Sequence, residues 1–293
     1  MGFTPQLATI GSFIQFNKFL SLIFSNSIMD EKILVGCPVS DYHLYCTEEY
    51  LNTLKSLTYK NYDILLVDNS KEDTFFNYLI RKGINAARIS FNENPRIRIV
   101  NARNLLRQKV LDDNYDFFLS LEQDVIPPKN IIEMALSHNK DMLSGVYCGN
   151  IKVGNQIRIL PLVYRFPPEF RLNEAKQIID SSKLKGLRQE TGSQYLEMVK
   201  AYYTIEELER EKPPTKIHSC GLGCVLIRRN VLEKVKFRFS EKYGGFDDVW
   251  FCEDAKSNFE IYVDPRIKCK HLIKNRPWDW RDLLKKEIGS NKI

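Results

Sequence analysis

Short, unbroken runs of apolar residues, separated by segments with helical spacing, constrain the fold of this chain more than any other feature. The apolar runs cover residues 32–37, 62–67, 86–91 and 115–121. The segments between them, with apolar residues three and four positions apart, cover residues 47–57, 72–82 and 97–111. Such runs are typical of strands buried on both faces of a sheet, and strands that alternate with helices are joined by right-handed crossovers. The pattern predicts an α/β fold with a mostly parallel central sheet flanked by helices.

Polar residues follow three of these runs where each predicted strand ends. They are Pro38-Val39-Ser40, Asp68-Asn69-Ser70 and Glu122-Gln123-Asp124. In open α/β sheets, ligands bind beyond the carboxyl ends of the strands. We therefore expect a binding site built from these three groups.

The sequence FFLSLEQDVIPP, residues 117–128, is the strongest local feature. Glu122 and Asp124 are two positions apart, and such residues face the same side of an extended chain. Two carboxylates on one side favour a site for Mg²⁺ or Mn²⁺, which could bridge the two phosphates of a nucleotide sugar. An ordinary acidic loop after a strand is the other interpretation of the same residues.

This acid-ended strand resembles the Asp-x-Asp motif of GT-A glycosyltransferases, and the chain is similar to family 2 of that group. Glu122 stands at the first position of the motif, so the resemblance implies that Asp124 is the firmer metal ligand. It also implies the GT-A fold for the α/β domain.

Three further segments of the first half resemble the family's donor site. KILVGCPVSDY resembles its first strand and loop, which implies that Pro38 and Ser40 lie against the nucleoside. LLVDNSKED resembles the second strand and implies that Asp68 contacts the base or ribose. NARN implies that Arg103 contacts the donor pyrophosphate, for which a guanidinium is well suited. Gln123, within the acidic motif, is counted with these donor-binding residues.

The second half continues the resemblance. HSCGLGCVLIRRNVLEKV, residues 218–235, implies that Gly221 and Gly223 let the backbone approach a sugar. GGFDDVWFCEDAKSNFEIYVDPRIKCKHL, residues 244–272, places Asp247 and Asp248 on the family's Glu-Asp pair. The resemblance implies that Asp248 is the general base that accepts the acceptor's hydroxyl proton. It also implies that His271 is a further metal ligand, a role that suits a neutral imidazole.

The resemblance implies an enzyme, a metal-dependent glycosyltransferase of the hexosyltransferase type. The expected donor is a UDP- or GDP-linked sugar, the expected cofactor Mn²⁺ or Mg²⁺, and the expected acceptor a hydroxyl of a glycan, lipid-linked or protein substrate. An aspartate base implies an inverting reaction. Two alternatives stay open: a sugar-phosphate nucleotidyltransferase, and an inactive sugar- or partner-binding module. The former usually has a basic, glycine-rich loop after the first strand, whereas CPVSDYHLY contains neither Gly nor Lys.

The expected domain boundaries lie where the pattern of strands and helices and the resemblance begin and end. We expect an N-terminal extension or amphipathic helix over residues 1–30, a catalytic domain over 31–272, and a basic tail helix over 273–293. Residues 149–216 form an insertion within the catalytic domain, on the acceptor side.

Charge and cysteine content exclude some classes of function. Eight Lys and Arg against three acidic residues from position 268 onward account for +5 of the net charge of +6. The rest of the chain is nearly neutral, which argues against nucleic-acid binding. The two ends are compatible with peripheral contact with a membrane. Seven cysteines, an odd number scattered along the chain, indicate reduced thiols and a cytoplasmic protein.

Overall fold

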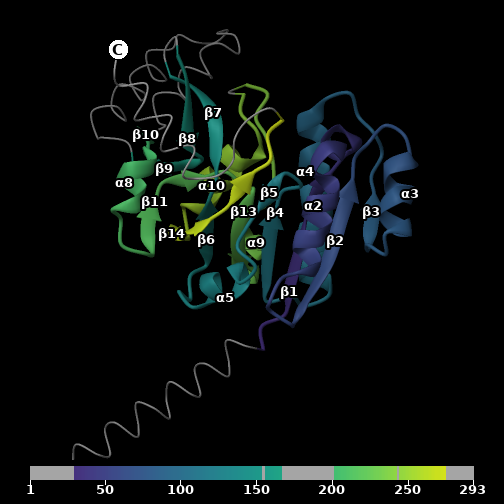
Figure 1. Ribbon diagram of the computed structural model, residues 1–293, viewed down its shortest axis with the longest axis horizontal. Coiled ribbons are helices and arrows are strands. Elements are labelled where there is room, and N and C mark those ends of the chain that lie inside the picture. Colours follow the sequence, from purple (N-terminus) through teal and green to yellow (C-terminus); the bar gives the residue numbers. More distant parts are fainter. Residues whose placement is uncertain (1–29, 154–155, 167–200, 243, 275–293) are drawn as a thin grey trace, which may run out of the picture.

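An eight-stranded sheet forms the centre of the protein in the computed structural model, which describes residues 30–153, 156–166, 201–242 and 244–274 (Figure 1). The strand order is β11-β14-β6-β13-β4-β1-β2-β3. The bounds are β1 (Ile33–Val39), β2 (Tyr62–Asp68), β3 (Ala86–Arg88), β4 (Phe117–Leu121), β6 (Met142–Val146), β11 (Thr215–Ile217), β13 (Cys224–Arg228) and β14 (Ile261–Lys268). β1 is parallel to β2 and β4, β2 to β3, and β6 to β14. β13 is antiparallel to both of its neighbours, and β11 to β14. The predicted mixed α/β fold, with a mainly parallel central sheet, is confirmed.

Helices cover both faces of the sheet and divide the core in two. One core cluster joins the sheet to α4 (Pro95–Asp112), α9 (Arg229–Lys234) and α10 (Asp247–Ala255). The other joins it to α2 (Leu44–Lys55), α3 (Thr74–Arg81) and α5 (Ile131–Leu136). Within β1, Leu34 belongs to the first cluster and Ile33 and Val35 to the second, because successive side chains point to opposite faces. Burial on both faces explains why the strands are unbroken apolar runs.

Short strands at one end of the sheet bring distant parts of the chain together. β5 (Val125–Ile126) pairs antiparallel with β15 (Lys270–His271), with His271 opposite Val125. β7 (Cys148–Val153) and β8 (Gln156–Pro161) form a hairpin. β9 (Val163–Arg165) lies between β10 (Ala201–Tyr202) and β12 (Ser219–Cys220). The β5–β15 pair is decisive for the site, because it places His271 beside the residues that follow β4.

The predicted helices and strands have the expected order, with some different bounds. α2 begins at Leu44 because a 3-10 turn, η1 (Asp41–His43), leads directly into it. Residues 215–228 form three strands, β11, β12 and β13, with Gly221 and Gly223 between the last two. Within the insertion, Thr204 and Glu207 form a capping box on α8 (Ile205–Glu209).

Three of the segments discussed above lie outside the described residues. They are residues 1–29, residues 167–200 of the insertion, and residues 275–293 of the basic tail. Among the residues that are described, no helix is long and apolar enough to cross a membrane.

Candidate active site

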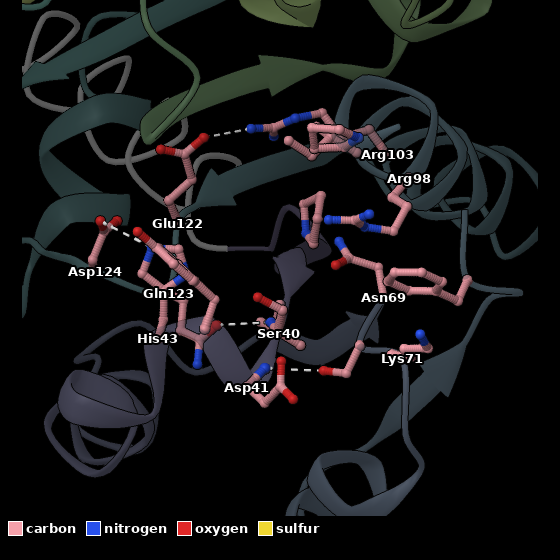
Figure 2. A pocket seen from close by; sticks show the side chains of 17 residues that line it. Ser40, Asp41, His43, Asn69, Lys71, Arg98, Arg103, Glu122, Gln123 and Asp124 are labelled. Carbon is pink, nitrogen blue, oxygen red and sulfur yellow. Dashed lines mark hydrogen bonds and ion pairs between the residues drawn. The ribbon is translucent and has the colours of Figure 1, made fainter. Parts of the chain in front are cut away.

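A cleft of 580 Å³ opens at the carboxyl ends of β1, β2 and β4 (Figure 2). These strands are parallel, so the polar groups that follow them meet at the same edge of the sheet. Glu122, Asp124 and His43 lie at one end of the cleft. Lys71 and Arg98 belong to the other part of its wall, so the cleft is acidic at one end and basic at the other.

Asp124 and His271 form the central contact of the acidic end. Nε2 of His271 lies 3.1 Å from Oδ2 of Asp124, and its Nδ1 lies 2.6 Å from the carbonyl oxygen of Cys148. Since a carbonyl can only accept, Nδ1 carries the proton that it donates to Cys148. An imidazolium would donate its second proton from Nε2 to the carboxylate, whereas a neutral imidazole turns a lone pair of Nε2 toward it. A cation shared by Nε2 and Oδ2 satisfies both atoms, so the pair suits a divalent metal.

His43 approaches the same carboxylate from the other side. Its Nε2 lies 3.6 Å from Oδ2 of Asp124, and 30% of its side chain is exposed in the cleft. No motif surrounds His43, so the sequence alone does not single it out. The available signal was its position, three residues after Ser40, in the loop beyond the first strand.

The two carboxylates of the acidic end have opposite electrostatic environments. Burial by itself would raise the pKa of Asp124, but the hydrogen bond and charge of His271, with His43 nearby, lower it. Burial raises the pKa of Glu122 to about 7, since repulsion from Asp124 and Asp247 adds to burial and outweighs the attraction of Arg103. The surroundings of Asp124 thus favour its charged form, and those of Glu122 oppose it.

Arg103 lies beneath the acidic end and is 2% exposed. Its guanidinium donates to Ser120 Oγ at 2.7 Å and to Glu122 Oε1 at 2.6 Å, and its Nε forms an ion pair with Asp247 Oδ2 at 2.5 Å. The guanidinium thus contacts three protein oxygens. The expected contact with a pyrophosphate stays a prediction, while the structure gives Arg103 the role of joining β4, α4 and the start of α10.

Glu122 is turned toward Arg103, whereas Asp124 faces His43 (Figure 2). Among the described residues, no three His, Cys, Asp or Glu side chains form a ready-made set of metal ligands. The expected group of Glu122, Asp124 and His271 is therefore present only as the Asp124–His271 pair. The remaining ligands of an ion would have to come from a substrate or from a movement of neighbouring side chains.

The loop after β1 is held by residues from the ends of β4 and β2. The backbone amide of Ser40 donates to Gln123 Oε1 at 3.0 Å, and Gln123 Nε2 donates to Thr47 Oγ1 at 2.8 Å. Gln123 is 2% exposed, so its amide positions this loop from below. Pro38 and Ser40 line the cleft, as does Gln123 itself.

Asp68 is fully buried and turns its carboxylate to its own neighbours. Oδ1 accepts hydrogen bonds from the backbone amide and hydroxyl of Ser70, at 3.0 and 2.6 Å, and Arg88 Nε lies 3.5 Å from Oδ2. Ser70 Oγ accepts a hydrogen bond from the amide of Asp41 at 2.9 Å. Asn69 and Ser70 line the cleft next to this carboxylate, and a direct contact of Asp68 with a base stays a prediction.

Gly221 and Gly223 lie against the phenol of Tyr147. The amide of Gly223 donates to Tyr147 Oη at 2.8 Å, and a Cβ atom at position 223 would lie 2.5 Å from Tyr147 Cζ. These glycines therefore accommodate a buried tyrosine, which the sequence analysis did not foresee. The ring of Tyr147 also packs edge-on against His271, with 5.2 Å between ring centroids.

Asp247 and Asp248 begin α10, where backbone amides and the helix dipole favour negative charge. Asp247 is buried against Arg103, and Asp248 accepts a hydrogen bond from the amide of Val249 at 2.8 Å. Within the described part of the chain, the 580 Å³ cleft is lined by neither of them. The ion pair between Asp247 and Arg103 nevertheless links the start of α10 to Glu122.

An aromatic ring with two cations forms part of the basic wall. The guanidinium carbon of Arg98 lies 4.7 Å from the ring centroid of Phe91, and Nζ of Lys71 lies 5.7 Å from it. Nε of Arg98 is buried and has no hydrogen-bond partner among the described residues. None of these three residues was selected from the sequence: Lys71 lies within LLVDNSKED but was not singled out there, and Phe91 and Arg98 lie outside the quoted segments.

Comparison with known proteins gives structural likeness alone. No model of a protein family matches the chain, and no curated protein matches it. A197 from STIV is 18% identical over 84% of this chain and 87% of its own, with a TM-score of 0.40. TarS 1–349 from S. aureus in complex with UDP-GlcNAc is 16% identical over 80% of this chain, with a TM-score of 0.45. The mannosyltransferase PcManGT from Pyrobaculum calidifontis, in complex with GDP-Man and Mn²⁺, is 12% identical over 88% of this chain, with a TM-score of 0.47.

The chain spans 56% of that TarS structure and 61% of the mannosyltransferase.

Proposed function

We propose that this protein transfers a sugar from a UDP- or GDP-linked donor to an acceptor hydroxyl, with the help of Mn²⁺ or Mg²⁺. One observation carries the proposal. The Asp124–His271 pair, with the tautomer of His271 fixed by Cys148, lies at the acidic end of a cleft formed by the loops after β1 and β2. This arrangement suits a diphosphate that is bound through a divalent cation.

The residues of the cleft have distinct roles in this proposal. Asp124 and His271 hold the cation, which neutralises the diphosphate leaving group when it is bound. Gln123 keeps the β1 loop, with Pro38 and Ser40, in place for the nucleoside. The Phe91–Arg98 wall offers a flat surface and positive charge to the donor.

Asp248 is the proposed general base of an inverting transfer. It lies at the start of α10, whose first residue, Asp247, is anchored by Arg103. Arg103 also binds Glu122, so this ion pair network positions Asp248 relative to the acidic end of the cleft. Asp247 acts here as a positioning residue, because its carboxylate is buried against Arg103.

The finer features of the proposal concern parts of the chain around the cleft. Residues 149–216 form the acceptor region of a catalytic domain over residues 31–272, and the two ends make peripheral contact with a membrane. The acceptor is a glycan, a lipid-linked substrate or a protein. All seven cysteines are free and buried, which supports the proposed cytoplasmic location.

The test measures release of nucleoside diphosphate from a panel of UDP- and GDP-linked sugars, with Mn²⁺ and with EDTA. We expect release from one donor class that requires the metal. Asp248→Asn should lower the rate by about 10²- to 10⁴-fold, the usual contribution of a general base, and should leave donor affinity unchanged. The exposed Asp112 on α4 provides the matched control, Asp112→Asn. Undiminished turnover in Asp248→Asn would refute the assignment of the base.

A further inference from the structure

We propose that His43 is a second imidazole ligand of the divalent cation, so that Asp124 lies between two histidines. The inference rests on the proposed function, because it concerns the same cation. It adds a residue from the loop after β1 to a pair formed by the ends of β4 and β15. A second imidazole ligand also determines which metals the site prefers.

The distances around Asp124 carry the inference. Nε2 of His271 and Nε2 of His43 lie 3.1 and 3.6 Å from the same oxygen, Oδ2. Ligand atoms bound to an ion at about 2.1 Å are separated by about 3.0 Å at a right angle and about 3.4 Å at the tetrahedral angle. The contact of His271 falls in this range and that of His43 lies slightly outside it. A small rotation of the His43 ring therefore completes the set, which agrees with the lack of a ready-made group of three ligands among the described residues.

The backbone position of His43 is fixed by the turn after β4, which carries Asp124. Its carbonyl accepts hydrogen bonds from Thr47 Oγ1 at 2.9 Å and Cys46 Sγ at 3.2 Å, and its amide donates to Ser40 at 3.2 Å. Thr47 Oγ1 and the amide of Ser40 are in turn bound by Gln123, the residue before Asp124. The backbone of His43 is thus tied to the end of β4, while its ring stays partly exposed and can turn.

The environment of the ring supports a ligand more than a surface residue. Tyr42 contacts it edge-on, with 5.0 Å between ring centroids, and Tyr45 lies at 6.0 Å. Nε2 faces Asp124 inside the cleft rather than bulk solvent (Figure 2). A histidine held in this way presents its nitrogen to the point that the Asp124–His271 pair already defines.

Two imidazoles and a carboxylate prefer Mn²⁺, Co²⁺ or Zn²⁺ to Mg²⁺, which favours oxygen ligands. The prediction is therefore selectivity for borderline transition metals. Replacing His43 with an oxygen ligand, in His43→Asp, should keep a cation site and shift its preference toward Mg²⁺.

The experiment measures binding of Mn²⁺ by electron paramagnetic resonance, with saturating UDP or GDP, in the full chain. We expect His43→Ala to weaken Mn²⁺ binding at least 10- to 100-fold, and Asp112→Ala, on the exposed surface of α4 and outside the cleft, to leave it unchanged. Electron spin echo measurements on bound Mn²⁺ should detect two imidazole nitrogens in the wild type and one in His43→Gln. This second readout does not depend on activity and identifies coordination directly.

The outcomes separate the two proposals. One coupled nitrogen in the wild type, or unchanged Mn²⁺ affinity in His43→Ala while Asp124→Ala loses it, would overturn the role of His43 and leave the proposed function intact. Mn²⁺ binding that survives Asp124→Ala would instead contradict the metal site of the proposed function. Weaker Mn²⁺ binding in His43→Ala with an unchanged nitrogen count would assign His43 to the bound diphosphate and also overturn the inference.

Discussion

At the scale of single residues, Arg103 is the side chain on which the site most depends. Its guanidinium binds Ser120 and Glu122 and pairs with Asp247, and Arg103, Ser120 and Asp247 are all buried. Removing one partner of a buried ion pair leaves an uncompensated charge, which usually costs more than the intact pair contributes.

Arg103→Met should therefore lower the free energy of unfolding by about 3–5 kcal/mol, as measured by urea denaturation. Adding Asp247→Asn should recover part of this loss, because the orphaned carboxylate is then gone. Arg81→Met, on the exposed surface of α3, is the control and should change stability by no more than about 0.5 kcal/mol. A loss below about 1 kcal/mol in Arg103→Met would show that the network contributes little to the fold.

Gly223 gives a second prediction at this scale, because its lack of a side chain makes room for Tyr147. In Gly223→Ala the new Cβ would lie 2.5 Å from Tyr147 Cζ and 2.9 Å from Glu122 Oε2, so we expect a destabilisation of about 1–3 kcal/mol by thermal or urea unfolding. Shortening the partner in the double variant Gly223→Ala, Tyr147→Leu should relieve part of it.

Gly149→Ala is the matched control for this variant. Its Cβ would meet the flexible end of Leu162 at 3.0 Å, which can move. Equal losses in Gly149→Ala and Gly223→Ala would contradict the argument that Tyr147 determines the need for glycine.

The predictability of individual residues depended on whether their sequence neighbours form a motif. Glu122 and Asp124 end an apolar run, so their place at the edge of the sheet follows from the sequence. His43 and Tyr147 have no such context, since their contacts are with residues more than 70 positions away. Arg103 could be selected, but its ion pair with Asp247 joins segments 144 positions apart and is invisible to local spacing.

At the scale of elements, Asp264 ties β14 to α5. It is fully buried in β14, and its Oδ2 lies 2.8 Å from His138 Nε2, just beyond the end of α5, and 2.7 Å from Arg266 NH2. Burial opposes ionisation, but hydrogen bonds from Arg266 and His138 overcome it and lower the pKa of Asp264. A lowered pKa in the folded state means that this aspartate stabilises the fold above its unfolded pKa of about 3.9, and that the contribution is lost as the pH falls through the folded pKa.

Asp264→Asn should consequently cost about 1–3 kcal/mol of unfolding free energy at pH 7. The difference between variant and wild type should shrink as the pH falls below about 4, where the unfolded wild-type chain begins to bind a proton at this carboxylate, and the folded form follows at lower pH. Urea denaturation of both proteins at pH 7, 5 and 3.5 tests this. A difference that stays constant over this range would contradict the linkage.

Long elements were more predictable than short ones. β1, β4 and α4 follow from uninterrupted patterns, and their bounds lie close to the expected ones. β12 and β13 are separated at Gly221–Gly223, where the backbone packs closely against Tyr147. β5 and β15 are each two residues long and pair with each other, so no local sequence pattern predicts them.

At the scale of the whole molecule, the parallel arrangement of β1, β2 and β4 creates the site. It brings the ends of three strands to one edge, and the β5–β15 pair adds His271 from a position nearly 150 residues further along the chain. The class of fold and the edge that carries the site could therefore be predicted from the sequence. The separate roles of the acidic residues could not be predicted, because they depend on which of these residues Arg103 neutralises.

Binding of a nucleoside diphosphate through a metal at Asp124 is the central claim, and thermal unfolding tests it most directly. Wild type and Asp124→Ala are compared with UDP, GDP, CDP and dTDP, each with and without Mn²⁺, and Asp112→Ala is the control. We predict that one nucleotide stabilises the wild type in the presence of Mn²⁺, by about 2.7 kcal/mol at 100 times its dissociation constant. The effect should vanish in Asp124→Ala and persist in the control. Absence of stabilisation by every nucleotide, or an equal effect in Asp124→Ala, would contradict the claim.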